Sequence, residues 1–193
     1  MYNPSNNGML TFDGVNDYIR ANITETQITT VDVWFYTPIQ ITSGAMSIGY
    51  GGLGNYGTSG VINQYDGFIF GDWTGGAANE TIGYYQHNPP GFIYIREVIP
   101  AGYHNIVMNY NITDATYDFF LNGNKVTRYT AAQGIVSLIS TDVVVLGCTG
   151  DPETVGSPYY GSCGIMNVKV YNRVLTEPEI KQNYNATKQR FAI

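Results

Sequence analysis

The chain has 193 residues, of which 44% are hydrophobic and only 12% are charged, well below the roughly 25% charged residues typical of soluble domains. Its formal net charge of −6 at pH 7 argues against a nucleic-acid-binding protein, because such binding depends on Lys and Arg side chains that neutralise phosphates. With 23 glycines and 17 tyrosines, the composition favours strands and tight turns, so we predict an all-β protein.

Short apolar or alternating runs recur along the chain and are separated by turn residues, which is the pattern of a sandwich or barrel. In chain order, these runs cover residues 8–12, 16–21, 29–37, 67–73, 81–86, 91–98, 103–111, 115–123, 124–130, 141–148 and 164–172. The section from 44 to 91 is rich in glycine and is predicted to hold short strands joined by exposed loops. No linker or internal repeat divides the sequence, so we predict a single domain over residues 1–193.

The stretch LTFDGVNDYIR at residues 10–20 has the oxygen-bearing side chains of a metal loop. It does not fit an EF-hand, because position 3 counted from Asp13 is Val15 and position 6 is Tyr18. Asp and Asn also form turns by accepting hydrogen bonds from nearby backbone amides. We therefore predict a turn over residues 13–16 that joins two strands.

Two further segments have clear strand signals. In TTVDVWFYT, strand alternation places Val31, Val33 and Phe35 on one fully apolar face. In YDFFLNGNKVTRY, Asn122 and Gly123 supply the positive φ angles that a two-residue type I′ turn requires. The sequence therefore predicts a core strand over residues 29–37 and a tight hairpin around Asn122.

One helix is expected, close to the end of the chain. In VLTEPEIKQNY, Thr176 is placed as the N-cap and Glu179 as its capping-box partner. Leu175 and Ile180 fit a hydrophobic staple, and Pro178 falls in the first turn, where its missing N–H costs nothing. We expect this short helix to lie against a sheet edge.

Six segments that together span almost the whole chain resemble the laminin-G-like domains of the concanavalin A-like jelly-roll class: LTFDGVNDYIR, TTVDVWFYT, AGYHNIVMNYN, YDFFLNGNKV, VVVLGC and YYGSCGIMNVKVYNRVLTEPEI. The closing YNRVLTEPEI is the most specific of them. The resemblance implies a two-sheet antiparallel jelly-roll sandwich with one short C-terminal helix. It does not imply one activity, because this fold hosts many functions.

The ending NYNATKQRFAI is similar to laminin-G-like domains in structural proteins of tailed bacteriophages, and the start MYNPSNNGML lacks a signal-peptide pattern. These features favour a non-enzymatic virion structural or binding protein, a capsid decoration or a tail- or fibre-associated component on the virion surface. The alternative is a carbohydrate-binding lectin module of a secreted or cell-surface protein, in an extracellular location. A glycoside hydrolase is a weaker alternative.

The expected partners are other virion proteins of the capsid or tail, a second copy of the chain, and a surface glycan; no nucleic acid and no membrane are expected.

No enzyme is predicted either. Glycanases of this fold class carry Glu-x-Asp-x-x-Glu on one strand, and no glutamate here begins that pattern. Nucleophilic catalysis by Ser or Cys usually needs a His base, and only His87 and His104 are present. We expect His104, in a strand-like run, to be structural.

Binding is better supported by the sequence than catalysis, because Tyr and Trp give a large contact area at small entropic cost. The candidate ligand-binding residues lie in aromatic loops and are Tyr50, Tyr56, Tyr65, Trp73, Tyr84, Tyr85, Tyr159 and Tyr160. The alternative for about half of them is packing within the sheets.

No cofactor is required, but calcium is an alternative to plain turn formation, since it prefers oxygen ligands. The residues that would offer such ligands are Asp13, Asn16, Asp17 and Asp151. Two cysteines, Cys148 and Cys163, each border an apolar run. They either form one disulfide or stay buried as free thiols.

Overall fold

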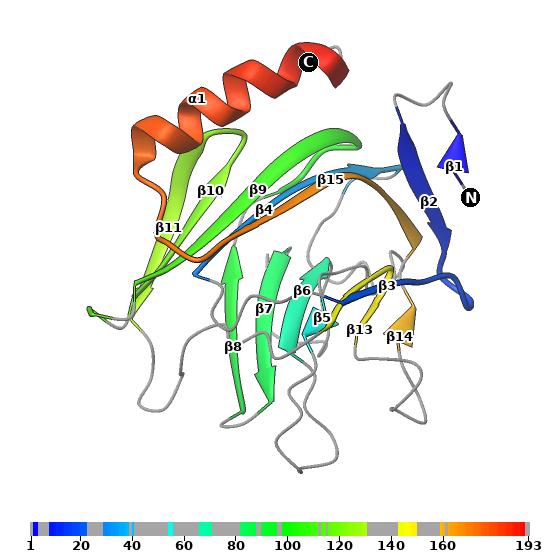
Figure 1. Ribbon diagram of the computed structural model, residues 1–193, viewed down its shortest axis with the longest axis horizontal. Helices are drawn as coiled ribbons and strands as arrows, with labels where there is room; N and C mark the ends of the chain where they lie inside the picture. The colour runs from blue at the N-terminus through cyan, green and yellow to red at the C-terminus, as the bar shows by residue number, and fades with distance from the viewer. Residues whose placement is uncertain are drawn as a thin grey trace.

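The computed structural model describes residues 2–3, 8–22, 29–38, 40, 54–55, 66–70, 82–87, 90–95, 98–111, 113–114, 116–130, 143–149, 159–160 and 162–191. Within these ranges, the strands form two large antiparallel sheets and one short two-stranded ladder, and a C-terminal helix lies on the outer side of one of the large sheets (Figure 1). The predicted all-β sandwich with one short C-terminal helix is therefore confirmed.

The larger sheet has seven strands in the order β1-β2-β15-β4-β9-β10-β11. Their bounds, in that order, are Tyr2–Asn3, Met9–Asp13, Ser162–Tyr171, Thr30–Thr37, Gly102–Asn111, Thr116–Leu121 and Asn124–Thr130. The second sheet has six strands in the order β3-β12-β5-β6-β7-β8, with bounds Ile19–Asn22, Val143–Leu146, Gly54–Asn55, Asp66–Phe70, Ile82–His87 and Pro90–Ile95. A two-stranded ladder pairs β13, Cys148–Thr149, with β14, Tyr159–Tyr160. The helices are α1, Glu177–Lys188, and the 3₁₀ turn η2, Gln189–Phe191.

The hydrophobic core includes the apolar face of β4. Val31, Val33 and Phe35 are each at most 3% exposed and belong to one cluster with Phe119 of β10. The side of residues 29–37 that faces the core is thus as apolar as strand alternation predicts. None of the helices that the structure describes is long and apolar enough to cross a membrane.

The turn after β2 leads from one sheet to the other. The Asp13 carboxylate accepts hydrogen bonds from the backbone N–H of Val15, at 2.7 Å, and of Asn16, at 3.4 Å. The Asp17 carboxylate in turn accepts one from the Asp13 N–H at 3.3 Å. The predicted turn is confirmed, and it joins β2 of the seven-stranded sheet to β3 of the six-stranded sheet.

The β10–β11 hairpin has the predicted two-residue turn. Asn122 and Gly123 have φ angles of 51° and 76°, and Leu121 pairs directly with Asn124. Asn122 also accepts a hydrogen bond from the Asn105 N–H at 2.9 Å, which ties the turn to β9. The turn is therefore fixed by its own sequence and by the neighbouring strand.

The expected position of α1 at a sheet edge is wrong. The helix lies across the outer face of the seven-stranded sheet, away from the six-stranded sheet (Figure 1). Ile180 packs in a buried cluster with Val107 of β9 and Phe120 of β10, while Tyr184 stacks on Trp34 of β4. The physical reason is that Trp34 lies on the second face of β4, where it would be exposed without the helix; it is 1% exposed here.

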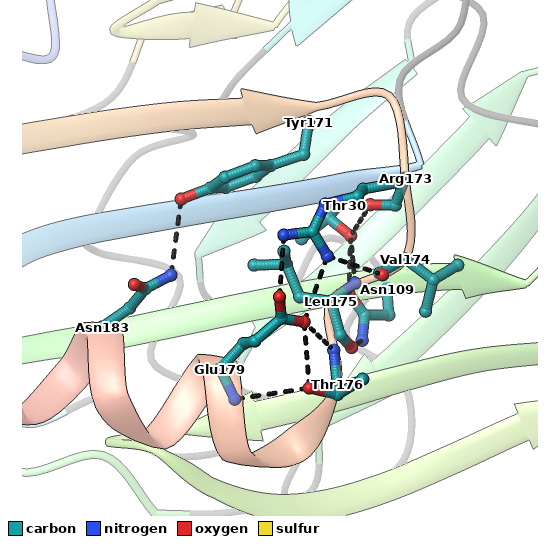
Figure 2. Close-up of polar contacts among 9 residues, drawn as sticks. All are labelled: Thr30, Asn109, Tyr171, Arg173, Val174, Leu175, Thr176, Glu179 and Asn183. Carbon is teal, nitrogen blue, oxygen red and sulfur yellow. Dashed lines mark hydrogen bonds and ion pairs between the residues drawn. The ribbon is translucent and has the colours of Figure 1, made fainter.

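The first turn of α1 has the capping box and staple that the sequence predicts. The Thr176 side chain accepts from the Glu179 N–H, while the Glu179 carboxylate accepts from the Thr176 N–H at 2.8 Å. Leu175 and Ile180 share one buried cluster. Arg173 donates to both Glu179 carboxylate oxygens, at 2.8 and 3.1 Å (Figure 2).

A buried polar network fixes the segment that leads into the helix. The Thr30 hydroxyl donates to Asn109 Oδ1, at 2.6 Å, and to the Arg173 carbonyl, at 2.8 Å. The Asn109 amide nitrogen donates to the Leu175 carbonyl at 2.7 Å (Figure 2). Buried polar groups of this kind need such partners, so strands β4 and β9 determine the path of the chain toward α1.

The left-handed backbone at Gly123 makes a testable link between the hairpin and the helix. A Cβ at this position would lie 2.9 Å from the Tyr184 ring, on a residue whose φ is 76°. We expect Gly123→Ala to cost roughly 1–3 kcal/mol in unfolding free energy and to increase amide exchange in α1. Gly14→Ala, at another positive-φ glycine, is the control for backbone strain alone. Equal amide exchange in α1 for both variants, measured by hydrogen–deuterium exchange, would contradict the link.

Glu179 gives the fold a specific acid dependence. Hydrogen bonds from Arg173, then from Thr176, lower its pKa from 4.5 to about 2. Because the folded pKa is below the unfolded one, the ionised carboxylate stabilises the fold above about pH 4.5, and this contribution is lost as the pH falls through about 2. Urea unfolding of Glu179→Gln should show a lower midpoint than the wild type at pH 7, with the gap closing below pH 4.5.

The control for that measurement is Glu177→Gln, since Glu177 also lies in the first turn and forms an ion pair in which its Oε1 lies 3.4 Å from Lys125 Nζ. Loss of this ion pair should lower the urea midpoint at pH 7 less than Glu179→Gln does. The same pH-dependent gap in both variants would refute the role of the Arg173 pair.

Candidate functional site

The aromatic residues that the sequence nominates fall into three groups. Tyr84 and Tyr85 lie on β7, and Tyr159 and Tyr160 form β14. The remaining four lie outside the described residues: Tyr50, Tyr56, Tyr65 and Trp73. In the sequence, three of these four come within three residues of an end of β5 or β6, so most of the nominated set belongs to the six-stranded sheet and its connections.

The pairing register assigns β7 to the two faces of that sheet. Leu146 and Ile19 pair with each other and both pack against the core, so their row is on the inner face. The next row, which contains Val145, is on the outer face because strand positions alternate. Val145 pairs with Gly54, Gly54 pairs with Gly67, and Gly67 pairs with Tyr85. Position 85 is therefore also on the outer face.

Tyr84 and Tyr85 are consecutive and therefore belong to opposite faces: position 84 to the inner face and position 85 to the outer face. Tyr85 pairs with Phe92 of β8, and Tyr94 follows two residues later on the same face. Positions 85, 92 and 94 thus lie close together on the outer face of β7 and β8. Phe92 and Tyr94 were not nominated from the sequence, although their alternation with isoleucine in FIYI was the signal that could have found them.

The residues nominated for calcium are only partly described. Asp13 and Asp17 lie in the turn between the sheets, where their carboxylates accept backbone hydrogen bonds. Asn16 is exposed in the same turn, and Asp151 lies outside the described residues. The part of the chain that the structure describes has no group of three His, Cys, Asp or Glu side chains arranged for a metal ion. Calcium binding stays a prediction.

Two buried titratable side chains, His104 and Asp32, have structural partners. His104 is buried, its Nε2 lies 2.8 Å from the Pro100 carbonyl oxygen, and its Nδ1 lies 3.2 Å from the Asn122 amide nitrogen. Burial lowers the pKa of His104 and raises that of Asp32. Asp32 accepts a hydrogen bond from Asn105 at 2.7 Å. Both side chains thus hold strands together, as expected for His104.

The alternative of a disulfide between Cys148 and Cys163 is wrong, because Cys163 is a free buried thiol. The two residues belong to different ladders. Cys148 pairs with Tyr160 in the β13–β14 ladder, whereas Cys163 pairs with Phe12 in the seven-stranded sheet. Burial raises the pKa of Cys163 to about 12, which keeps the thiol protonated and unreactive.

Comparisons with known proteins identify the fold. No protein-family model and no curated protein matches the sequence. Among solved structures, a heptameric SAP-like pentraxin from Limulus polyphemus is 13% identical with a TM-score of 0.61, and the match covers 90% of this chain and 79% of the pentraxin. A CBM40 of a Ruminococcus gnavus IT-sialidase is 17% identical with a TM-score of 0.56, and the match covers 91% of this chain and 97% of the CBM40.

The binding domain of botulinum neurotoxin DC is 10% identical with a TM-score of 0.65; the match covers 96% of this chain but only 44% of that domain. All three are lectin-like jelly rolls, so this chain has a lectin-like jelly-roll fold. At these identities the similarity extends to the fold alone. The bacteriophage context suggested by the sequence has no support among them.

The state of Cys163 can be tested directly. We expect native protein to show no iodoacetamide labelling at Cys163 over several hours, and complete labelling in urea, by peptide mass spectrometry. Reducing agent should leave the melting temperature unchanged. A Cys148–Cys163 peptide found without reduction would contradict the assignment, and Cys148→Ser gives the matched control for labelling at the other thiol.

Proposed function

We propose that this chain is a non-enzymatic, lectin-like module that binds a carbohydrate in an extracellular setting. The observation that carries the proposal is the asymmetry of the two outer sheet faces. On the seven-stranded sheet, α1 occupies the face around Trp34, which is 1% exposed. On the six-stranded sheet, no helix lies on the outer face in the part of the chain that the structure describes, and positions 85, 92 and 94 are aromatic.

Aromatic rings on a sheet face suit a sugar, because the apolar side of a pyranose ring stacks on them while its hydroxyl groups stay near water. The chain also has few charged groups, so neutral polar contacts dominate its surface chemistry. We infer that Tyr85 is a contact residue and that Tyr84, on the inner face, is a packing residue.

Proteins of similar fold support this proposal. A Ruminococcus gnavus sialidase CBM40 has been solved with α2,3-sialyllactose, and cell entry of botulinum neurotoxin type C depends on interaction with two ganglioside molecules. The lectin alternative from the sequence thus becomes the leading proposal. The virion role, with its capsid or tail partners and virion-surface location, stays a prediction that no finding supports.

The neighbouring tyrosines give a matched pair for testing the proposal. We expect wild-type protein to bind saturably on a glycan array, and Tyr85→Ala to weaken binding of the best ligand about tenfold or more. The size of this effect follows from stacking on an aromatic ring, which contributes roughly 1–3 kcal/mol for a nucleic-acid base. We expect a similar contribution for a sugar ring. Tyr84→Ala should lower the melting temperature while the folded protein retains its affinity. Failure of the wild type to bind any glycan would refute the proposal.

A further inference from the structure

The Asn122–Gly123 turn is a chemically reactive pair of residues. An Asn followed by Gly can lose its side-chain amide, because glycine has no side chain to hinder the approach of its backbone nitrogen to the Asn amide carbon. A bond forms between the glycine nitrogen and Cγ, the Cγ–Nδ2 bond breaks, and ammonia leaves with the proton that the glycine nitrogen gives up. Water then opens the succinimide ring at either carbonyl, which yields aspartate or isoaspartate.

Both polar atoms of the Asn122 side chain contact strand β9. Its Oδ1 accepts a hydrogen bond from the Asn105 N–H at 2.9 Å, and its Nδ2 lies 3.2 Å from His104 Nδ1. The backbone N–H of Asn122 donates to the Asn105 carbonyl at 2.8 Å. The amide has to turn away from β9 before its carbon can meet the Gly123 nitrogen, so these side-chain contacts must break before the reaction starts.

The His104 ring is fixed in the orientation that the Asn122 contact needs. The Pro100 carbonyl can only accept, so Nε2, 2.8 Å away, holds the ring proton, and Nδ1 accepts from Asn122 Nδ2. Burial lowers the pKa of His104, which favours this neutral ring. Phe35 packs on the ring at 5.6 Å. His104 and Asn105 are 8% and 1% exposed, so both partners of the Asn122 amide are buried residues of β9.

The product of the reaction would not fit the turn in the same way. Leu121 pairs directly with Asn124, so only two residues close the hairpin. Isoaspartate adds one CH₂ group to the backbone of this turn, and hairpin register depends on loop length. Gly123 lies so close to the Tyr184 ring of α1 that a Cβ would come within 2.9 Å of it. A longer turn therefore changes the contact between the hairpin and the helix.

We propose that Asn122 is a deamidation site that the native fold keeps closed through strand β9, and that its conversion to isoaspartate loosens helix α1. Opening of the β10–β11 hairpin has to precede the reaction. Because loss of ammonia is irreversible, modified protein accumulates in proportion to the time that the hairpin spends open. The site therefore acts as a chemical record of local unfolding at the edge of the seven-stranded sheet.

Peptide mass spectrometry over a time course in mildly alkaline buffer tests the first half of the proposal. We expect Asn122 to convert about tenfold or more slowly in the native protein than in urea, because its hydrogen bonds must break first. Asn7–Gly8, the other Asn–Gly pair of the sequence, gives the reference rate for the unfolded chain in urea. Equal native and urea rates at Asn122 would overturn the proposal.

The role of β9 is tested with His104→Phe, which keeps an aromatic ring but removes the Nδ1 acceptor, and should raise the native rate of conversion at Asn122. Thr30→Val, which removes the buried hydroxyl bonded to Asn109, is the control for lost stability and should raise that rate less. Equal rates in the two variants would contradict the role of the histidine. Thermal melts establish that each variant is folded; if His104→Phe is not, the native and urea rates of the wild type decide alone.

The effect on α1 is tested in an Asn7→Ser background, where Asn122–Gly123 is the remaining Asn–Gly pair. Protein converted in urea is refolded and its isoaspartate form isolated. We expect faster hydrogen–deuterium exchange in α1 for this form than for unconverted protein, and a smaller increase for freshly prepared Asn122→Asp, which has the charge without the longer backbone. Equal exchange in the isoaspartate and unconverted forms would overturn the link to the helix.

Discussion

The stack of Trp34 on Tyr184 is the contact on which the arrangement of this molecule depends. The two rings are 5.4 Å apart and within 2° of parallel, and Phe191 packs on Trp34 at 4.9 Å. Gly123 lets the β10–β11 turn approach the same Tyr184 ring. One aromatic cluster therefore joins the central strand β4, the β10–β11 hairpin, the helix α1 and the 3₁₀ turn η2. With the helix held there, it covers the outer face of the seven-stranded sheet around Trp34.

Among the described residues, several ion pairs lie on the face of the seven-stranded sheet that α1 covers. Lys125 lies 2.9 Å from Asp118 and 3.4 Å from Glu177, and Lys169 lies 3.8 Å from the buried Asp32. Of these three pairs, Lys125–Glu177 is the one that joins α1 to the sheet, and an exposed pair of this kind contributes little stability. Burial of Asp32 is costly, as its raised pKa indicates, and hydrogen bonding from Asn105 offsets part of that cost.

Local signals in the sequence were sufficient for the local structure. The Asn122–Gly123 turn and the Thr176–Glu179 capping box each depend on a few adjacent residues, and both are present as predicted. The alternation in residues 29–37 likewise predicted the core face of β4. The class of the fold followed from many such segments in order, which is why it was predictable without knowing any strand pairing.

Long-range features were not predictable in the same way. The predicted position of α1 at a sheet edge was wrong because Trp34 and Tyr184 are far apart in the sequence, and no local pattern shows that their rings stack. The state of Cys163, a free buried thiol, was not predictable either, because the sequence does not show that the two cysteines lie in different ladders. For the candidate site, composition drew attention to the tyrosines, but only the register separates position 84 from position 85 and aligns Gly54 with Gly67.

The place of β15 in the seven-stranded sheet has a consequence for how the protein is made. Ser162–Tyr171 lies between β2 and β4, so strands synthesised early stay unpaired along one side until this late segment has left the ribosome. Sheets closed by such distant pairing fold slowly, and open strand edges are prone to aggregate while they wait. We therefore expect the seven-stranded sheet to form slowly and aggregation of incomplete sheets to compete with its folding.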